Sequence, residues 1–180
     1  MKQKVSDYIA DRLAQEGISQ VFTVTGGGAM HLNDSLGHHP GLTCLYQHHE
    51  QAAAMAAEAY ARVDNRMAAV CVTSGPGATN AITGALCAWM DSIPMLVLSG
   101  QVRYDTTVRH SGLKIRTMGV QEYDITPSVE PMTKYAVMVT DPLTIRYHLE
   151  RAIYLAKTGR PGPCWLDLPL NIQSAIIETD

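Results

Sequence analysis

A single glutamate, Glu50, stands where a short strand gives way to a helix. Residues 43–46 have β-forming character, and from His49 onward alanine, methionine, glutamate and arginine favour a helix. The carboxylate is therefore expected in the first helical turn at the carboxyl end of a strand, the edge where open α/β sheets bind ligands. Glu50 either complements the helix dipole or, because the alanine-rich run behind it predicts close packing, is partly buried and paired. A paired carboxylate of this kind can exchange a proton with a bound ligand.

Two glycine-rich loops, residues 25–28 and 73–80, follow predicted strands at the same edge of the sheet. Glycines after a strand indicate a backbone that must approach another group closely. The first loop is not a dinucleotide-binding fingerprint, because G-x-G-x-x-G fails at His31. Ser74 is not in a nucleophile elbow, because Val72 replaces the first glycine of G-x-S-x-G. Ser74 is instead expected to cap the following helix.

Two histidine pairs, His38-His39 and His48-His49, raise the question of a metal site. Adjacent side chains point apart, and no carboxylate or cysteine completes a ligand set at helical spacing. We therefore assign no metal ligand in this chain and interpret the histidines as surface residues or supports for neighbouring groups.

The rest of the chain alternates between strand-like and helix-like patterns. Residues 5–13 have helical spacing, and Gly17 is placed to end that helix in a left-handed turn. The last long helix of the chain is marked by Asp141-Pro142 at its start and Gly159 beyond its end. Repeated β-α alternation predicts an α/β protein, a three-layer α/β/α fold with a six-stranded, mainly parallel sheet. The strands are expected at residues 20–24, 43–46, 67–73, 94–99, 134–139 and 164–168.

Two further segments carry expectations. The long stretch from Gly100 to Thr133 has little regular pattern beyond a predicted helical turn at residues 121–125, and loops of this length are usually functional or disordered. The predicted helix that opens in the loop of residues 73–80 and runs to about Trp89 carries small side chains from Ala78 to Ala88, which would let another backbone come close. That surface fits either a tight contact within the chain or a two-fold contact between subunits.

Length, charge and cysteine content limit the class of protein. A chain of 180 residues with 46% hydrophobic residues fits one α/β domain. Its net charge of -3, with both signs well mixed, gives no basic surface for nucleic acid or an anionic membrane. No apolar run approaches the length of a membrane span, and the four cysteines are spaced as reduced thiols rather than a disulfide framework. The protein is expected to be cytoplasmic.

With these residues placed, the sequence closely resembles the N-terminal, pyrimidine-binding domain of thiamine-diphosphate enzymes of the acetolactate synthase group. The matching stretches span nearly the whole chain in the family's order. They are Val21-Phe22 through Gly26-Gly27; His49-Glu50-Gln51-Ala52-Ala53 through Ala59-Tyr60-Ala61-Arg62; Thr73-Ser74-Gly75-Pro76-Gly77-Ala78-Thr79-Asn80 with Met90-Asp91-Ser92-Ile93-Pro94 and Gly100-Gln101-Val102; and Gly159-Arg160-Pro161-Gly162-Pro163 with Asp167-Leu168-Pro169-Leu170.

The resemblance implies roles for individual residues. Glu50 would hydrogen-bond to a ring nitrogen of the cofactor's aminopyrimidine and so promote removal of the proton from carbon 2 of the thiazolium. Gln121 would lie near the substrate, pyruvate or another 2-oxo acid, and counts with Glu50 as a candidate catalytic residue. The implied residues at the thiamine diphosphate site are Thr25, Gly26, Gly27, Glu50, Thr73, Pro76, Gly77 and Asn80.

The resemblance also implies how the chain is organised. Residues 1–170 correspond to the pyrimidine-binding domain, and residues 171–180 to the start of a linker to a missing domain. The magnesium ligands are expected in that C-terminal domain, and FAD could be a further cofactor of the full-length enzyme. Because the family's site forms between subunits, a homodimer or higher homo-oligomer is expected. The chain is either a fragment of a longer enzyme, the preferred interpretation, or one subunit of a split enzyme.

Three functions stay open at this stage. The first is decarboxylation of a 2-oxo acid with transfer of the acyl carbanion, carried out by the larger enzyme and not by the isolated chain. The second is transfer of a two-carbon unit to a keto-sugar in polysaccharide biosynthesis. The third is a non-enzymatic dimerisation or regulatory module. Glu50 together with both glycine loops favours an enzyme, since scaffolding alone requires none of them.

Overall fold

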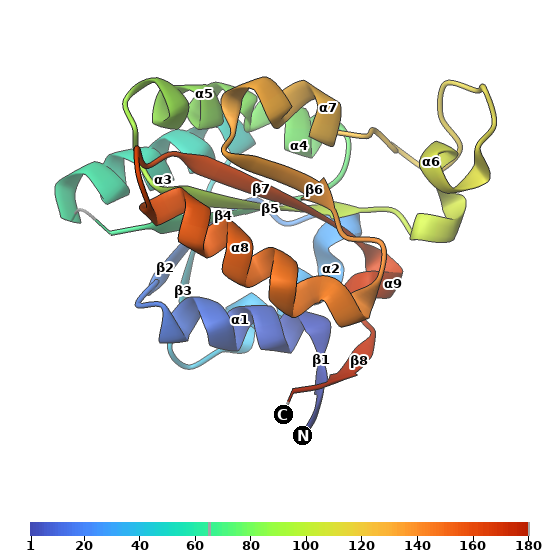
Figure 1. Ribbon diagram of the computed structural model, residues 1–180, viewed down its shortest axis with the longest axis horizontal. Helices are drawn as coiled ribbons and strands as arrows, with labels where there is room; N and C mark the ends of the chain where they lie inside the picture. Colours follow the sequence, from blue (N-terminus) through green and yellow to red (C-terminus); the bar gives the residue numbers. More distant parts are fainter. Residues whose placement is uncertain (65, 180) are drawn as a thin grey trace.

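A six-stranded sheet lies in the middle of the described part of the chain, with helices on both faces (Figure 1). The computed structural model describes residues 1–64 and 66–179. The strand order is β3-β2-β4-β5-β7-β6, and neighbouring strands are parallel throughout. The predicted three-layer α/β/α fold is confirmed. The strands are β2 (Gln20–Thr23), β3 (Thr43–Tyr46), β4 (Ala68–Val72), β5 (Met95–Gln101), β6 (Tyr135–Met138) and β7 (Pro163–Pro169).

The central strands β4 and β5 are buried along their whole lengths. They pair in parallel, with Val70 opposite Val97. A parallel strand covered by helices on both faces needs a nearly continuous apolar sequence, because neither side meets water. This is the pattern that predicted a central strand at residues 67–73.

Large aliphatic side chains fill the core on one face of the sheet. Four helices cover this face, and Leu13, Leu149 and Leu166 of β7 are completely buried in its core. Gly17 has a φ of 79° just beyond the first helix, as its position predicted. The helices are α1 (Val5–Gln15), α2 (Met30–His38), α8 (Ile145–Lys157) and α9 (Leu170–Gln173).

The start predicted for the last long helix is confirmed in part. The carboxylate of Asp141 accepts a hydrogen bond from the Leu143 N–H at 3.0 Å, as an N-cap does. The first turn is a 3-10 turn, η4 (Pro142–Thr144), and α8 begins only at Ile145. Gly159 follows with a φ of 62°.

The core on the other face is rich in alanine, which packs there around a few large side chains such as Trp165. Four buried alanines of α3, residues 53, 54, 57 and 61, pack there with Val70 and Val97. The helix predicted to run to about Trp89 is divided in two at Ala81, and a Cβ atom at Gly84 would lie only 2.5 Å from the Cβ atom of Ala54. These small residues therefore serve a tight contact within the chain. The helices of this face are α3 (Glu50–Asp64), α4 (Pro76–Asn80), α5 (Ile82–Met90) and α7 (Thr126–Val129).

The segment between β5 and β6 contains short helical elements, but the helical turn predicted at residues 121–125 is wrong. Gln121 has a left-handed backbone with a φ of 57°, and α7 begins at Thr126. The carboxylate of Asp124 accepts hydrogen bonds from the N–H and the hydroxyl of Thr126, so a side chain organises the turn before α7. The other elements are η2 (Tyr104–Thr106), α6 (Val108–Ser111) and η3 (Glu130–Met132).

The two ends of the chain pair with each other. β1 (Lys2–Lys4) and β8 (Ile176–Glu178) form an antiparallel ribbon, with Gln3 opposite Ile177 (Figure 1). The sequence assigned residue 170 to the end of the domain and the residues after it to a linker. In the structure, residues 170–173 form α9 and residues 176–178 form β8. The boundary at residue 170 remains a prediction, and Asp180 lies outside the described residues.

Two further observations bear on the sequence expectations. Among residues 1–64 and 66–179, no helix is both long enough and apolar enough to cross a membrane. All four cysteines are free, and burial raises the pKa of the Cys71 and Cys164 thiols to about 12. Both thiols therefore stay protonated near neutral pH.

The contact between α3 and α5 predicts a large effect of Gly84→Val. A side chain at this position would also lie 2.7 Å from the backbone carbonyl carbon of Ala54, which cannot turn away. We expect a loss of about 2 kcal/mol or more in the free energy of unfolding, measured with urea. The control is Thr83→Val, on the exposed side of the same helix, which should change stability by less than about 0.5 kcal/mol. Equal stabilities of the two variants would contradict this packing.

Candidate functional site

Glu50 is the first residue of α3 and is half-buried at the carboxyl end of the sheet. The helix start is supported by His49, whose Nδ1 accepts a hydrogen bond from the Gln51 N–H at 3.1 Å. One carboxylate oxygen, Oε2, accepts a hydrogen bond of 2.9 Å from Nδ2 of Asn80, at the end of α4. The expectation that Glu50 is partly buried and has a partner is confirmed. The contact joins two residues that the family resemblance placed in one site.

Thr73, the first residue of the second glycine loop, contacts glycines of both loops. Its Oγ1 accepts a hydrogen bond of 3.0 Å from the Gly28 N–H. A Cβ atom at Gly26 would lie 2.5 Å from Thr73 Cγ2, and one at Gly77 would lie 2.6 Å from the same atom. The Cβ at Gly77 would also lie 3.4 Å from Oε1 of Glu50, so the glycine leaves space beside the carboxylate. Any side chain at Gly26 or Gly77 would come too close to Thr73, so both positions favour glycine.

The first glycine loop is held by side chains to which the sequence assigned no role. Asn33 Nδ2 donates to the Gly26 carbonyl at 3.3 Å, and Gln173 Nε2 donates to the Gly28 carbonyl at 2.7 Å. A Cβ atom at Gly100 would overlap that same Gly28 carbonyl. Gln173 is fully buried although it lies in the segment expected to be a linker. The sequence offered one indication of this role for Gln173, a polar residue shortly after an apolar strand.

Gln121 lies beside the second glycine loop. Gly75 has a φ of 56°, and a Cβ atom there would overlap the carbonyl oxygen of Gln121. The next residue, Glu122, holds the segment, because its carboxylate accepts hydrogen bonds from the N–H groups of Val108 and Gly119 at 2.6 and 3.1 Å. The structure thus places the backbone of Gln121 against the second glycine loop, while its place near a substrate remains a prediction.

The remaining predicted site residues lie on the same two loops. Thr25, Gly27 and Pro76 are exposed there. The interpretation of Ser74 as a helix cap is wrong, because α4 begins after Gly75 and has no side-chain cap. The residues that the described structure brings into contact around the carboxylate are Gly26, Glu50, Thr73, Gly77 and Asn80.

A buried carboxyl group, Asp167, lies near the same edge of the sheet. It is fully buried in β7 directly opposite Ser99 of β5, whose hydroxyl donates a hydrogen bond of 2.6 Å to it. Nε2 of Gln101 donates a second hydrogen bond of 3.1 Å. Burial raises the pKa of Asp167 to about 7, although both hydrogen bonds oppose this shift. The signal available in the sequence was a charged residue within an otherwise apolar strand.

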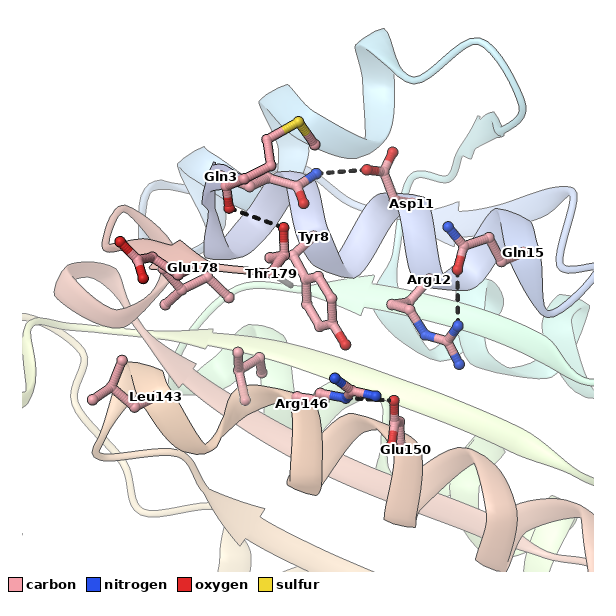
Figure 2. A pocket seen from close by; sticks show the side chains of 13 residues that line it. Gln3, Tyr8, Asp11, Arg12, Gln15, Leu143, Arg146, Glu150, Glu178 and Thr179 are labelled. Carbon is pink, nitrogen blue, oxygen red and sulfur yellow. Dashed lines mark hydrogen bonds and ion pairs between the residues drawn. The ribbon is translucent and has the colours of Figure 1, made fainter.

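A cleft of about 500 Å³ opens on the opposite face of the sheet from α3, between α1, α8 and the β1–β8 ribbon (Figure 2). Its walls include paired side chains, Arg12 with Gln15 at 2.8 Å and Arg146 with Glu150 at 3.1 Å. None of the predicted site residues is among the described residues that line it. The cleft is separate from the Glu50 site.

Fold and site together define an α/β ligand-binding domain, in which two glycine loops and a half-buried glutamate meet at the carboxyl edge of a parallel sheet. The family model described as "Thiamine pyrophosphate enzyme, N-terminal TPP binding domain" matches residues 3–123. The chain belongs to this family. The resemblance noted in the sequence is thereby confirmed.

Similar proteins are acetolactate synthases. The chain is 37% identical over 169 residues to the large subunit from Lactococcus lactis, and 39% identical over 167 residues to the isozyme 3 large subunit from Escherichia coli. It is 36% identical over 174 residues to the chloroplastic acetolactate synthase 1 of Oryza sativa. The alignments cover 94%, 93% and 95% of this chain but 28%, 28% and 25% of these relatives. The chain therefore spans about a quarter of their length.

The raised pKa of Asp167 predicts how stability depends on pH. Between about pH 4 and pH 7 the folded chain keeps a proton that the unfolded chain has lost, so the free energy of unfolding should fall as the pH rises. Relative to Asp167→Asn, which does not titrate there, we expect a decrease of up to about 4 kcal/mol. Urea unfolding of both proteins across this range measures it. A stability difference that stays constant with pH would contradict the buried, protonated carboxyl.

Proposed function

We propose that this chain forms the aminopyrimidine half of a thiamine diphosphate site in an acetolactate-synthase-like enzyme. That enzyme would decarboxylate pyruvate or another 2-oxo acid and transfer the resulting acyl group to an acceptor. The observation that carries the proposal is the Glu50 carboxylate, paired with Asn80 and set beside the space that Gly77 leaves open. Membership of the thiamine pyrophosphate family and similarity to acetolactate synthases support it.

The residues present fit an aminopyrimidine ring. Glu50 would share a proton with a ring nitrogen, and the Asn80 hydrogen bond to Oε2 would orient the carboxylate while Oε1 faces the Gly77 side. Gly26 and Gly77 have no side chains to obstruct a flat ring, and Thr73 spaces the two loops. When bound, thiamine diphosphate supplies the electron sink for loss of carbon dioxide, and the protein orients it.

The other half of the site would come from a second domain. Among the described residues, no group of three or more His, Cys, Asp or Glu side chains is arranged to hold a metal. We propose that a separate domain holds magnesium and the diphosphate, with FAD as a further candidate cofactor of the full-length enzyme. A homodimer is the simplest assembly if that domain belongs to another copy.

Glu50→Gln in the complete enzyme tests the proposed role of the carboxylate. Glutamine keeps the size and hydrogen-bonding reach of glutamate but removes the exchangeable acid. We expect hydrogen–deuterium exchange at carbon 2 of the bound cofactor to slow by roughly a hundredfold or more, in line with general acid–base contributions. Nuclear magnetic resonance of the quenched cofactor measures this rate. An unchanged rate would remove the catalytic assignment and leave only a helix-end charge.

The matched control is Glu130→Gln. Glu130 is exposed in η3, outside both glycine loops, and its substitution should leave the exchange rate unchanged. Glu58, two turns along α3, is a poorer comparison, because it is 8% exposed and ion-paired with Arg62. Its loss would change the stability of the helix as well as its charge.

A binding prediction follows from the half-site. The diphosphate and magnesium carry the strongest charge-assisted contacts of the cofactor, and their ligands are proposed to lie in another domain. We expect the 180-residue chain alone to bind thiamine diphosphate with a dissociation constant weaker than about 0.1 mM by calorimetry, with magnesium present. A control titration without magnesium should give the same weak signal. A dissociation constant below about 1 μM would show a complete site in this chain.

A further inference from the structure

The left-handed turn at Gln121 is held from several sides. A non-glycine residue with a φ of 57° persists only where its surroundings enforce it. On one side the Gln121 carbonyl lies against Gly75, and on another the carboxylate of Glu122 holds the N–H groups of Met118 and Gly119. The third constraint is on Tyr123, whose carbonyl accepts a hydrogen bond of 2.8 Å from Nε2 of Gln101.

The amide of Gln101 has one orientation that satisfies its neighbours. Nε2 donates both to the Tyr123 carbonyl and to Oδ2 of Asp167, and Oε1 accepts from the Val102 N–H at 3.0 Å. A turned amide would place its oxygen against two acceptors and its nitrogen against a donor. Because the side chain is 1% exposed, water cannot compensate for those losses.

Asp167 is the group that sets this orientation. Its two oxygens accept from Ser99 and Gln101, and Trp165 Nε1 donates to the Ser99 hydroxyl at 2.8 Å, which directs the hydroxyl proton to Asp167. The ionisable groups that influence Asp167 are Asp124 and Arg109, which are themselves ion-paired at 3.2 Å on the segment that carries Gln121. Ser99 and Gln101, the side chains of β5 that face Asp167, have no ionisable group.

We propose that Asp167 is a positioning residue for Gln121: it orients the Gln101 amide, which holds the Tyr123 carbonyl and with it the turn that presents Gln121. The importance of this turn for catalysis rests on the proposed function. The chain of hydrogen bonds itself does not, since it is made entirely within the described residues.

A role in packing alone does not account for Asp167. A leucine or valine would fill a buried position in β7 without the cost of burying a carboxyl group. The carboxyl supplies two acceptor oxygens that those side chains lack, and one of them faces the amide that reaches the Gln121 segment. The benefit of Asp167 is therefore the orientation of Gln101 rather than strand stability.

Three variants of the 180-residue chain test the proposal by amide hydrogen exchange and mass spectrometry. Asp167→Leu removes the acceptor, and Gln101→Leu removes the donor to Tyr123. Asp167→Asn is the conservative variant, because its carbonyl oxygen can still accept from Gln101 while its amide group faces the Ser99 hydroxyl. Peptides covering residues 118–126 report on the turn, and peptides covering β4 report on global unfolding.

In both leucine variants we expect exchange in residues 118–126 to be at least about tenfold faster, with β4 unchanged, and in Asp167→Asn to remain at the parent's rate. Unchanged exchange of residues 118–126 in both leucine variants would overturn the proposal. It would also be overturned by equal acceleration throughout the sheet in both, or by an asparagine variant that behaves like the leucine variant. No cofactor is used, so these outcomes are independent of the carbon 2 exchange measured with Glu50→Gln.

Discussion

Close approach of backbone segments at the carboxyl ends of β2, β4 and β5 is the constraint on which the site depends. Gly100 admits the carbonyl of Gly28 onto β5, and Gly26 and Gly77 both meet the side chain of Thr73. A Cβ atom at Gly26 or Gly77 would force the two loops apart, and one at Gly100 would push the first loop away from β5. Their closeness keeps a space beside Glu50 while Asn80 still reaches its carboxylate.

The two faces of the sheet are packed differently, and this difference places Glu50. Large aliphatic side chains separate α1 and α8 from the strands, whereas alanines bring α3 close to the sheet and to α5. Gly84 of α5 lies directly against Ala54 of α3, because glycine places no side chain between the two helices. Because interiors are close-packed, α3 has little freedom to shift, so the carboxylate at its first turn is held by packing one turn away.

A buried polar network organises the other half of the same edge. Asp167 and Gln101 connect the sheet to the segment that carries Gln121, and Gly75 connects that segment to the second glycine loop. Gln121 and Glu50 are thereby held by a single framework, although they lie on different elements. The cleft between α1 and α8 takes no part in this framework.

The sequence by itself determined the fold class, the six strands to within two residues at each end, and Glu50 at the start of a helix. These features follow from local periodicity and propensity, which act over a few neighbouring residues. Only the tertiary structure decided the left-handed turn at Gln121, the β1–β8 ribbon, and the contributions of Gln173 and Asp167. Each of these depends on partners far away in the chain, such as the bond between Gln173 and Gly28. No local pattern specifies them, because the energy of a buried hydrogen bond depends on which groups the fold brings together.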